Sequence, residues 1–496
     1  MKALVNKQNF HLILLFLILL LALFFRTYDI VNRFEFAHDG DLYSWIVKDI
    51  VVDKHLRLIG QLTTAPGIFI GPAFYYMLIP FFLLTKMDPV GAVIPVTAIG
   101  VLTVASYYYV FAKLFDRRVG LIAAFLYAVL LSPVYFDRRI VPSTPTNLWL
   151  IWYFYTVVMF TRGRYHVLPL LGLLIGLIWH IHIALIPALV ASLIAIFLSR
   201  KLPSPKQVIL AFFALLISSV PLLLFETRHG FSQTLSFFSN LTINHGGGVG
   251  LQKFYLVIIK ATGDITRLLF YPQGLPFINN TLFVGMLLLG AIFLVRKYLL
   301  AARELVVFYV WIGAIILYYT FSSTIISEYY FVNIEIVFLT IVTLLLYLLY
   351  CSSRIGRRIT IGVLAVILLK NAFYLITADV YHKGYNERKA IASYIAEDSR
   401  KNDFPCVGIS YITAEGENVG FRYFFWLNNL HINHPQSNVP IYTIVLPDEL
   451  APDTIEARFG HIGVIPPQTA PSQKEIRDGC SGQNTNLTDS MFGFTQ

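Results

Sequence analysis

A cluster of ionisable side chains lies close to the start of the chain. Within seven residues the sequence places Glu35, His38, Asp39 and Asp41. A carboxylate in a site that excludes water can act as a general base and accept the proton of a hydroxyl group. Asp39 and Asp41 are two residues apart, so they diverge on a helix and share a face in an extended turn. The alternative is structural, because either aspartate could cap an amphipathic helix over Tyr43–His55, and we favour this role for Asp41.

Two adjacent arginines, Arg138 and Arg139, follow an apolar run in a turn shaped by Pro142 and Pro145. A guanidinium group can bind phosphate through two parallel hydrogen bonds. The alternative is that both side chains reach from the hydrocarbon layer to its polar surface. The sequence favours neither interpretation.

Histidines and a further acid lie at the ends of two other apolar runs. His180 and His182 are two residues apart, whereas a metal-binding pair on a helix is expected four residues apart. His182 is therefore either a structural residue at a helix end or a ligand for a phosphate or sugar hydroxyl. Glu226, Arg228 and His229 form either a local ion pair beside a histidine or a polar wall for a sugar or phosphate. The sequence contains no motif of a zinc hydrolase, a serine hydrolase or a nucleotide-binding fold.

The elements that position these residues are apolar. Of the 496 residues, 57% are hydrophobic and 13% are charged, which is about half the charged fraction of an ordinary soluble protein. The mean hydropathy is +0.67. These values exclude disordered, collagen-like and coiled-coil chains and predict a polytopic membrane protein. The three cysteines are too few for a disulfide framework or a Cys-rich metal cluster.

Apolar stretches of about 20 residues, the length that crosses the hydrocarbon layer as a helix, recur along the chain. We expect eleven spanning helices, near residues 10–25, 90–111, 119–136, 145–161, 166–183, 183–199, 207–225, 281–295, 305–321, 330–350 and 359–377. The short connectors between alternate spans are rich in Lys and Arg, which are retained on the cytoplasmic side. The net charge of +10 therefore reflects membrane topology and gives no reason to expect a nucleic-acid partner.

The stretch Ile68–Leu84 decides the topology, because it is as apolar as the spans. If it crossed the membrane, every basic connector would lie outside. Pro66, Pro72 and Pro80 also favour a broken element that stays in the interface or re-enters. We therefore predict an integral protein of the cell (inner or plasma) membrane, with its N-terminus in the cytoplasm and its C-terminus outside.

This topology predicts two parts. A transmembrane module occupies residues 1–377 and includes a first outer loop over 26–89 and a long outer loop over 226–280. An extracytoplasmic domain occupies residues 378–496.

The composition of the second part predicts a small α/β domain with its own core. Short apolar runs with strand character lie at 406–412, 441–446 and 462–465, and residues 385–397 have helical spacing. The C-terminal end is polar, and we expect it to be loose. Cys406 and Cys480 both lie in this domain and could pair, although their spacing alone cannot establish the bond.

The predicted spans carry few ionisable side chains, with Glu335 and Lys370 as the exceptions. Transporters place such groups near the middle of their spans. In this chain the polar residues gather at the outer ends of the spans. This distribution favours chemistry at the outer membrane surface over passage through the membrane.

Several segments resemble bacterial membrane glycosyltransferases of the GT-C superfamily, in particular the protein O-mannosyltransferase and lipid A aminoarabinose transferase group. The resemblance covers roughly residues 1–350 and lies in Asp39-Gly40-Asp41, Gly60–Pro80, Met87-Asp88-Pro89, the His182 segment and Phe225–His229. Many members of the group have Asp-Glu where this chain has Asp39-Gly40. The choice between Asp39 and Asp41 therefore stays open.

The resemblance implies a fold and a reaction. The fold is an all-α polytopic membrane protein of about 11 transmembrane helices, GT-C-like, with a small C-terminal α/β extracytoplasmic domain. The reaction moves a sugar from a polyprenyl-phosphate donor to a hydroxyl acceptor on a protein, lipid or glycan, with inversion at the anomeric carbon. Asp39 or Asp41 would be the general base, and basic groups would stabilise the leaving phosphate. Candidates for binding the donor phosphate or sugar are Arg138, Arg139, His182, Glu226, Arg228 and His229. Some related enzymes use a divalent metal, and nothing in the sequence requires one.

Two other functions stay open. A lipid-carrier or polysaccharide transporter would depend on Glu335 or Lys370 and would tolerate Asp39→Asn. A non-catalytic component of an envelope assembly complex would keep full activity with Asp39→Ala.

Reporter fusions test the predicted topology. We expect a reporter fused after residue 377 to be exported and a reporter fused near Arg117 to stay cytoplasmic, because the basic connectors remain inside. Paired fusions to alkaline phosphatase and to green fluorescent protein measure the two outcomes. Export of the fusion near Arg117 would contradict the topology.

Overall fold

The structure is a computed structural model that describes residues 10–63, 65–240, 246–272, 278–468 and 471–494. The chain divides into two compact units. The first unit comprises Met1–Tyr28, Thr64–Gly71 and Val96–Ala378, and the second comprises Asp29–Thr63, Pro72–Pro95 and Asp379–Gln496. Most of the first outer loop thus groups with the C-terminal segment, whereas we expected it to belong to the transmembrane module.

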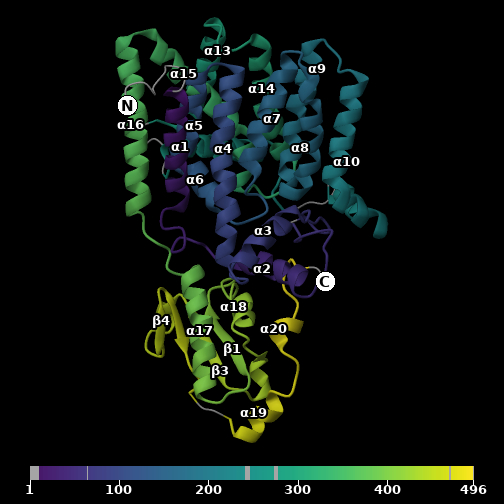
Figure 1. The fold of residues 1–496 in the computed structure, drawn as a ribbon, viewed down its shortest axis with the longest axis vertical. Coiled ribbons are helices and arrows are strands. Elements are labelled where there is room, and N and C mark those ends of the chain that lie inside the picture. Colours follow the sequence, from purple (N-terminus) through teal and green to yellow (C-terminus); the bar gives the residue numbers. More distant parts are fainter. Residues whose placement is uncertain (1–9, 64, 241–245, 273–277, 469–470, 495–496) are drawn as a thin grey trace. The chain divides into compact units, whose positions relative to one another are not determined.

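The membrane part of the chain is helical (Figure 1). Its helices are α1 (Phe10–Thr27), α4 (Val93–Leu114), α5 (Arg117–Val129), α6 (Leu131–Arg138), α7 (Thr146–Thr161), α8 (Leu168–Ile181), α9 (Val190–Ser199), α10 (Pro205–Arg228), α11 (Ser232–Asn240), α12 (Leu251–Phe270), α13 (Asn280–Arg296), α14 (Ala302–Phe321), α15 (Val332–Ser352) and α16 (Arg354–Thr377). Short 3-10 turns precede three of them, at η2 (Tyr165–Val167), η3 (Ile183–Leu189) and η4 (Glu328–Phe331).

Among the described residues, six helices are long and apolar enough to cross a membrane, and the number rises to seven if the bent pair α5–α6 is one span. Helices also lie at the other expected positions, but Tyr165–Ile181, Ile183–Ser199 and Asn280–Arg296 are shorter. The prediction of an integral membrane protein with several apolar helices is confirmed. The count of eleven spans stays a prediction.

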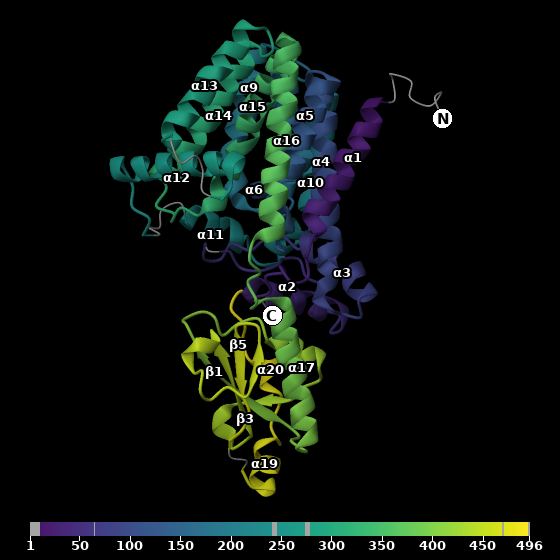
Figure 2. The same ribbon diagram turned by 90° about the vertical axis from the view of Figure 1, so that its left-hand side faces the viewer.

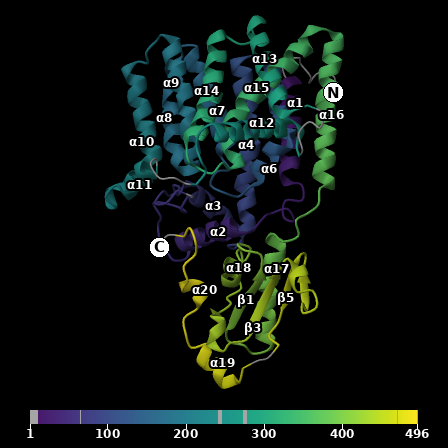
Figure 3. The same cartoon turned by 180° about the vertical axis from the view of Figure 1, so that it is seen from behind.

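Helices α8 and α10 lie side by side (Figure 3) and approach each other closely at two glycines. A Cβ atom on Gly172 would lie 2.1 Å from the carbonyl oxygen of Ala211, and one on Gly176 would lie 2.0 Å from Ser218 Oγ. Small residues four apart allow helices in a membrane to pack backbone against backbone. Elsewhere α10 presents large apolar side chains outward, such as Ile217, which is 71% exposed, as contact with lipid requires.

We expected one span over 119–136, but the structure breaks it into α5 and α6, which meet at 63°. Leu130 has extended backbone angles at the break. Pro133 explains why the helix cannot continue, because its ring would clash with the carbonyl group of Val129, four residues earlier. The break leaves carbonyl groups without partners in the apolar interior.

Two side chains from distant helices satisfy these carbonyl groups. Asn371 Nδ2 in α16 donates to the oxygen of Val129 at 2.9 Å. Arg26 Nη1 in α1 donates to the oxygen of Ala128 at 3.2 Å. Arg26 is fully buried, and its charge is balanced by Asp137 in α6, with 2.7 Å between Nη2 and Oδ2. The break in the helix therefore depends on three side chains. Arg26 and Asn371 donate to the carbonyl groups at the break, and Asp137 balances the charge of Arg26.

The second unit contains helices and one sheet. Its elements are α2 (His38–Val51), α3 (Ala73–Leu84), η1 (Pro89–Ala92), α17 (Tyr385–Lys401), β1 (Val407–Thr413), α18 (Arg422–Leu427), β2 (Ile432–Asn433), η5 (Pro435–Ser437), β3 (Ile441–Leu446), η6 (Asp448–Leu450), β4 (Ala457–Phe459), β5 (Ile462–Ile465), α19 (Gln473–Gly479) and α20 (Thr485–Thr488). The strands follow the order β2-β1-β3-β5-β4. Strand β1 is parallel to β2 and β3, whereas β5 is antiparallel to β3 and β4. The expected small domain containing strands is confirmed.

Helix α17 packs along the sheet (Figure 2). Tyr442 in β3 donates from its hydroxyl to Asp398 Oδ2 in α17 at 2.6 Å. The rings of Tyr394 and Phe459 are 5.7 Å apart and join α17 to β4.

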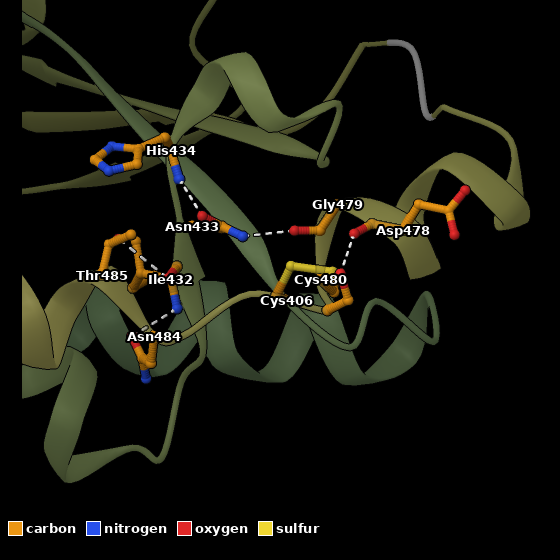
Figure 4. The surroundings of a disulfide bond; sticks show 10 residues. Cys406, Ile432, Asn433, His434, Asp478, Gly479, Cys480, Asn484 and Thr485 are labelled. Atoms are coloured by element: carbon orange, nitrogen blue, oxygen red, sulfur yellow. Dashed lines mark hydrogen bonds between the residues drawn. A yellow bond between two sulfur atoms is a disulfide. The ribbon is translucent and has the colours of Figure 1, made fainter.

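A disulfide joins Cys406, which directly precedes β1, to Cys480 at the end of α19 (Figure 4). Asn433 Nδ2 donates to the carbonyl oxygen of Gly479 beside the disulfide. Further along, Asn484 Oδ1 accepts from the backbone N–H of Ile432 at 3.1 Å. The C-terminal end is therefore fastened to the sheet, which corrects our expectation of a loose end.

Helix α3 has 12 residues. A helix of this length is too short to cross the hydrocarbon layer, which needs about 20 residues. Pro72 precedes its first turn and Pro80 lies inside it. These features agree with an element over Ile68–Leu84 that does not span.

Loss of the disulfide tests how far the C-terminal fold depends on it. We expect Cys406→Ser to lower the free energy of unfolding of the second unit by about 2–5 kcal/mol, because the bond closes a loop of 74 residues. Protease digestion of the full chain in increasing urea measures the change. The exposed, free Cys351 in α15 provides the matched control, Cys351→Ser, which should leave the transition unchanged. Equal transitions for both variants would contradict this account.

Candidate active site

Asp39 and Asp41 lie in the first turn of α2, which begins at His38. We expected a helix that begins at Tyr43 with Asp41 as its cap, and this expectation is wrong. Ala37 is the residue before the helix, and no side chain caps it. Because the first turn of a helix exposes unpaired N–H groups, both carboxylates are favourable there.

Asp41 is buried, with 3% of its surface exposed, and it stabilises a different helix. Its Oδ1 accepts from the backbone N–H of Tyr423 at 2.7 Å, in the first turn of α18. Burial raises the pKa of Asp41 to about 6, against the opposing effects of this N–H group and of the charges of Arg422 and Arg388. Asp41 is therefore a structural residue of the second unit.

Asp39 differs from Asp41 in its exposure and in its contacts. Its side chain is exposed, and the described part of the chain offers its carboxylate no hydrogen-bond partner. Burial raises the pKa of the Tyr43 phenol, and the nearby negative charge of Asp39 raises it further. Asp39 thus carries an exposed carboxylate in the first turn of α2.

The second unit also places Gln61 and Tyr75 close to each other, both within the stretch Gly60–Pro80. The Tyr75 hydroxyl donates to Gln61 Oε1 at 3.0 Å and accepts from the Gln61 backbone N–H at 3.2 Å. The charge of Asp39 acts on Tyr75 as it does on Tyr43, raising a pKa that burial has already raised. These hydrogen bonds join the loop that follows α2 to the start of α3.

In the first unit, the end of α6 carries both predicted phosphate-binding arginines. Arg138 is partly buried, and its Nη2 donates to the carbonyl oxygen of Tyr28 at 2.9 Å. Arg139 is exposed and directly follows the last turn of the helix. Of the two guanidinium groups, that of Arg139 is the more accessible to a phosphate.

The ion pair of Arg26 and Asp137 precedes these arginines, and the sequence did not lead us to predict it. Asp137 also accepts hydrogen bonds from the Tyr127 hydroxyl at 2.8 Å and from Asn147 Nδ2 at 3.5 Å. One signal could have found it: both charged residues fall at the predicted outer ends of apolar runs, where a single charge would be costly.

Glu226 is buried near the end of α10, and both of its carboxylate oxygens are used within the fold. They accept from the backbone N–H groups of Gln233 at 3.1 Å and Thr234 at 3.0 Å, which begin α11. Among the described residues, no ion pair joins Glu226 to Arg228, which is exposed. His229 stacks on Phe225 with 4.1 Å between ring centroids. Glu226 is thus a helix cap, and the three residues do not form the ion pair that the sequence suggested.

His182 also has a structural role. Its Nδ1 accepts from the backbone N–H of Ala184 at 3.1 Å and caps the 3-10 turn η3. Its ring lies 6.0 Å from that of Tyr330. A role of His182 in binding a donor stays a prediction.

In the part of the chain that the structure describes, Asp39 belongs to no group of three His, Cys, Asp or Glu side chains with their ligand atoms within 4.8 Å of one another. Among the described residues, one group of three has its ligand atoms within 4.8 Å, namely Asp448, Glu449 and His461. It contains none of the predicted site residues. Arg458 Nη1 already lies 2.9 Å from Asp448 Oδ2 and opposes a second cation.

Comparisons with known proteins bear on the fold of the chain. Residues 70–224 match the family model described as dolichyl-phosphate-mannose-protein mannosyltransferase. The chain is similar to the crystal structure of ArnT from Cupriavidus metallidurans in the apo state, with a TM-score of 0.60 and 12% identity over 93% of this chain and 98% of that chain. It is also similar to the same protein bound to undecaprenyl phosphate, with a TM-score of 0.57 and 14% identity over 94% of this chain and 100% of that chain.

The chain has the GT-C fold. Both the matched segment and the structures agree with the resemblance that the sequence motifs indicated. Among curated proteins, none matches the chain by sequence.

The environment of Asp41 predicts a pH-dependent stability. Its pKa is higher in the folded state than its ordinary value of 3.8, so the folded state binds more protons between about pH 4 and pH 6. We therefore expect the stability contributed by this group to fall as the pH rises across that range, by up to about 3 kcal/mol.

Thermal unfolding of the purified protein between pH 4 and pH 7 measures this dependence. Asp41→Asn removes the titrating group but can still accept the Tyr423 hydrogen bond, so its unfolding temperature should vary less with pH. The same slope in the wild-type protein and the variant would contradict the assignment.

Proposed function

We propose that the chain is an inverting glycosyltransferase, which moves a sugar from a polyprenyl-phosphate donor to a hydroxyl acceptor on the extracytoplasmic face of the membrane. The GT-C fold supports this function, because the similar ArnT structure is described as bound to undecaprenyl phosphate. The family model over residues 70–224 also describes a transferase that uses a lipid-phosphate sugar. The identities of the sugar and of the acceptor do not follow from these likenesses.

The observation that carries the assignment of the base is the contrast between the two aspartates. Asp41 is buried and bonded to the backbone N–H of Tyr423, whereas Asp39 is exposed, and its carboxylate has no partner in the described parts of the chain. A general base has to reach the proton that it removes, and only Asp39 is free to do so. This contrast favours Asp39 over Asp41.

The proposed reaction is a single displacement. The oxygen of the acceptor hydroxyl attacks the anomeric carbon of the sugar, and the bond between that carbon and the phosphate oxygen breaks. The hydroxyl proton moves to Asp39, and polyprenyl phosphate leaves with the bonding electron pair. Because attack occurs opposite the leaving group, the anomeric configuration inverts.

Candidates for binding the donor lie in the first unit. Arg139 is the more accessible of the two arginines, and a guanidinium group there would stabilise the charge that develops on the leaving phosphate. Arg138, His182 and Glu226 already bond to the backbone, so their loss would disturb the fold as well as any donor contact. Arg228 and His229 stay as further candidates.

The disulfide supports the proposed location of the C-terminal domain. A bond between Cys406 and Cys480 is expected to form and persist outside the reducing cytoplasm. It agrees with a C-terminus on the extracytoplasmic side and an N-terminus in the cytoplasm.

Transfer assays test the function and its base together. Membranes that contain the protein are incubated with a panel of radiolabelled undecaprenyl-phosphate sugars, and the label is followed into lipid, glycan and protein fractions. We expect Asp39→Asn to lower the rate by about 10²–10⁴-fold while leaving insertion intact, because it removes the proton acceptor.

Glu35→Gln is the matched control, because Glu35 is an exposed acid in the same loop. It should keep the wild-type rate. Undiminished transfer by Asp39→Asn would exclude Asp39 as the base, and absence of transfer from every donor would refute the function. Loss of activity on mutation of Glu335 or Lys370 with Asp39→Asn unaffected would favour a transporter.

A further inference from the structure

The end of the chain returns to the loop that carries Asp39. We call residues 485–494 the terminal segment. Arg422, at the start of α18, donates from Nη2 to the carbonyl oxygens of Asn486 at 2.8 Å and Asp489 at 2.9 Å. Asn486 Nδ2 donates back to the carbonyl oxygen of Arg422 at 3.0 Å. This reciprocal set of bonds fixes the path of the terminal segment.

The last residues of the terminal segment contact the loop after α2. The backbone N–H of Leu62 donates to the carbonyl oxygen of Gly493 at 3.2 Å. The guanidinium carbon of Arg57 lies 4.2 Å from the ring centroid of Phe494. Arg57 also donates from Nε to Asp49 Oδ2 in α2 at 2.6 Å. The terminal segment is thus connected, through Arg57, to the helix that carries Asp39.

Within the terminal segment, the side chain of Phe492 is 80% exposed. Its ring centroid lies 5.9 Å from that of His38, the residue that directly precedes Asp39. The backbone on both sides is held, since Phe494 N–H donates to the carbonyl oxygen of Met491 at 3.0 Å. The fold therefore holds a large, exposed apolar ring beside His38, the residue before the proposed base. A bound molecule that covered this ring would bury its apolar surface, which is favourable.

We propose that the terminal segment forms the acceptor side of the active site, and that Phe492 contacts a saccharide acceptor. The proposal rests on the proposed function. The atom of a general base lies within about 2.6–3.2 Å of the heavy atom whose proton it accepts, so the acceptor hydroxyl has to sit at Asp39. The remainder of the acceptor then extends over the neighbouring side chains, which include His38 and Phe492.

The chemistry of these two side chains selects the class of acceptor. The face of a phenyl ring offers an apolar surface to the C–H groups of a pyranose, and an imidazole can hydrogen-bond a sugar hydroxyl. A sugar ring therefore fits both groups while one of its hydroxyls reaches Asp39. A small Ser or Thr side chain offers no comparable surface to the ring of Phe492.

Titration of acceptor against donor tests this proposal with the full chain reconstituted in lipid vesicles. The donor is the radiolabelled undecaprenyl-phosphate sugar that gives Asp39-dependent transfer, and the acceptor source is membrane extract from a host that lacks the protein. We expect Phe492→Ala to raise the amount of extract needed for half-maximal transfer by roughly tenfold or more. The donor concentration at half-maximal rate should not change, and Phe492→Trp should restore the wild-type value.

Leu487→Ala is the matched control, because Leu487 lies in the same segment, is 48% exposed and has no described contact with the loop after α2. It should behave as the wild-type protein, and the label should appear in the saccharide fraction. The proposal would be overturned if the Phe492→Ala variant needed no more extract for half-maximal transfer than the Leu487→Ala variant. It would also be overturned if Phe492→Ala changed only the dependence on donor concentration. Label confined to protein would overturn the saccharide class. If transfer by the wild-type protein depends on Asp39, the outcomes above concern the acceptor site alone. If no such transfer occurs, the proposed function itself has failed.

Discussion

The architecture of the membrane unit depends on one buried ion pair. Arg26 is fully buried, and its guanidinium group does two things at once. It supplies hydrogen-bond donors to the carbonyl groups of Tyr127 and Ala128 at the end of α5, and its charge is neutralised by Asp137 in α6. In a hydrocarbon environment, neither an unpaired carbonyl group nor an isolated charge is tolerated. Removing one partner of a buried ion pair typically costs about 3–5 kcal/mol, so the break and the pair require each other.

This break determines where the polar residues of the first unit lie. Because α6 departs from α5 at 63°, it ends at Arg138 and Arg139 rather than continuing as a straight span. Arg138 then bonds to the carbonyl oxygen of Tyr28, where α1 has ended. The ion pair thus joins the end of the first membrane helix to the segment that carries the candidate phosphate ligands.

The sequence predicted the helices and strands that depend on a local pattern of residues. It did not predict the contacts that a side chain makes with an element far away along the chain. Apolar length located the membrane helices, and alternating apolar runs located the strands β1, β3 and β5. Asp41 was expected to cap its own helix, but it caps α18, more than 300 residues further along the chain. For Glu226 the sequence left open an ion pair or a polar wall for a sugar or phosphate, and it did not predict that this carboxylate caps α11. Composition cannot reveal such partners, because the unpaired N–H groups at the start of any helix could donate to these carboxylates.

The same limitation explains the C-terminal end. Its polar composition predicted a loose segment, because low hydrophobicity leaves little surface to bury. The structure holds it instead through a disulfide, the guanidinium group of Arg422 and backbone hydrogen bonds, which composition does not show. The sequence alone could not decide which of the two aspartates, Asp39 or Asp41, is the general base. Our proposal of Asp39 depends on a difference that composition does not show, because Asp41 is buried and Asp39 is exposed.

The anomeric configuration of the product tests the central claim most directly. A single displacement with Asp39 as base inverts the configuration, so a donor of known configuration gives a product of the opposite one. Proton NMR of the purified product distinguishes the two through the coupling constant of its anomeric proton. The account predicts inversion in the wild-type product. Retention of the donor configuration is incompatible with a single displacement from the face opposite the leaving group and would contradict the mechanism.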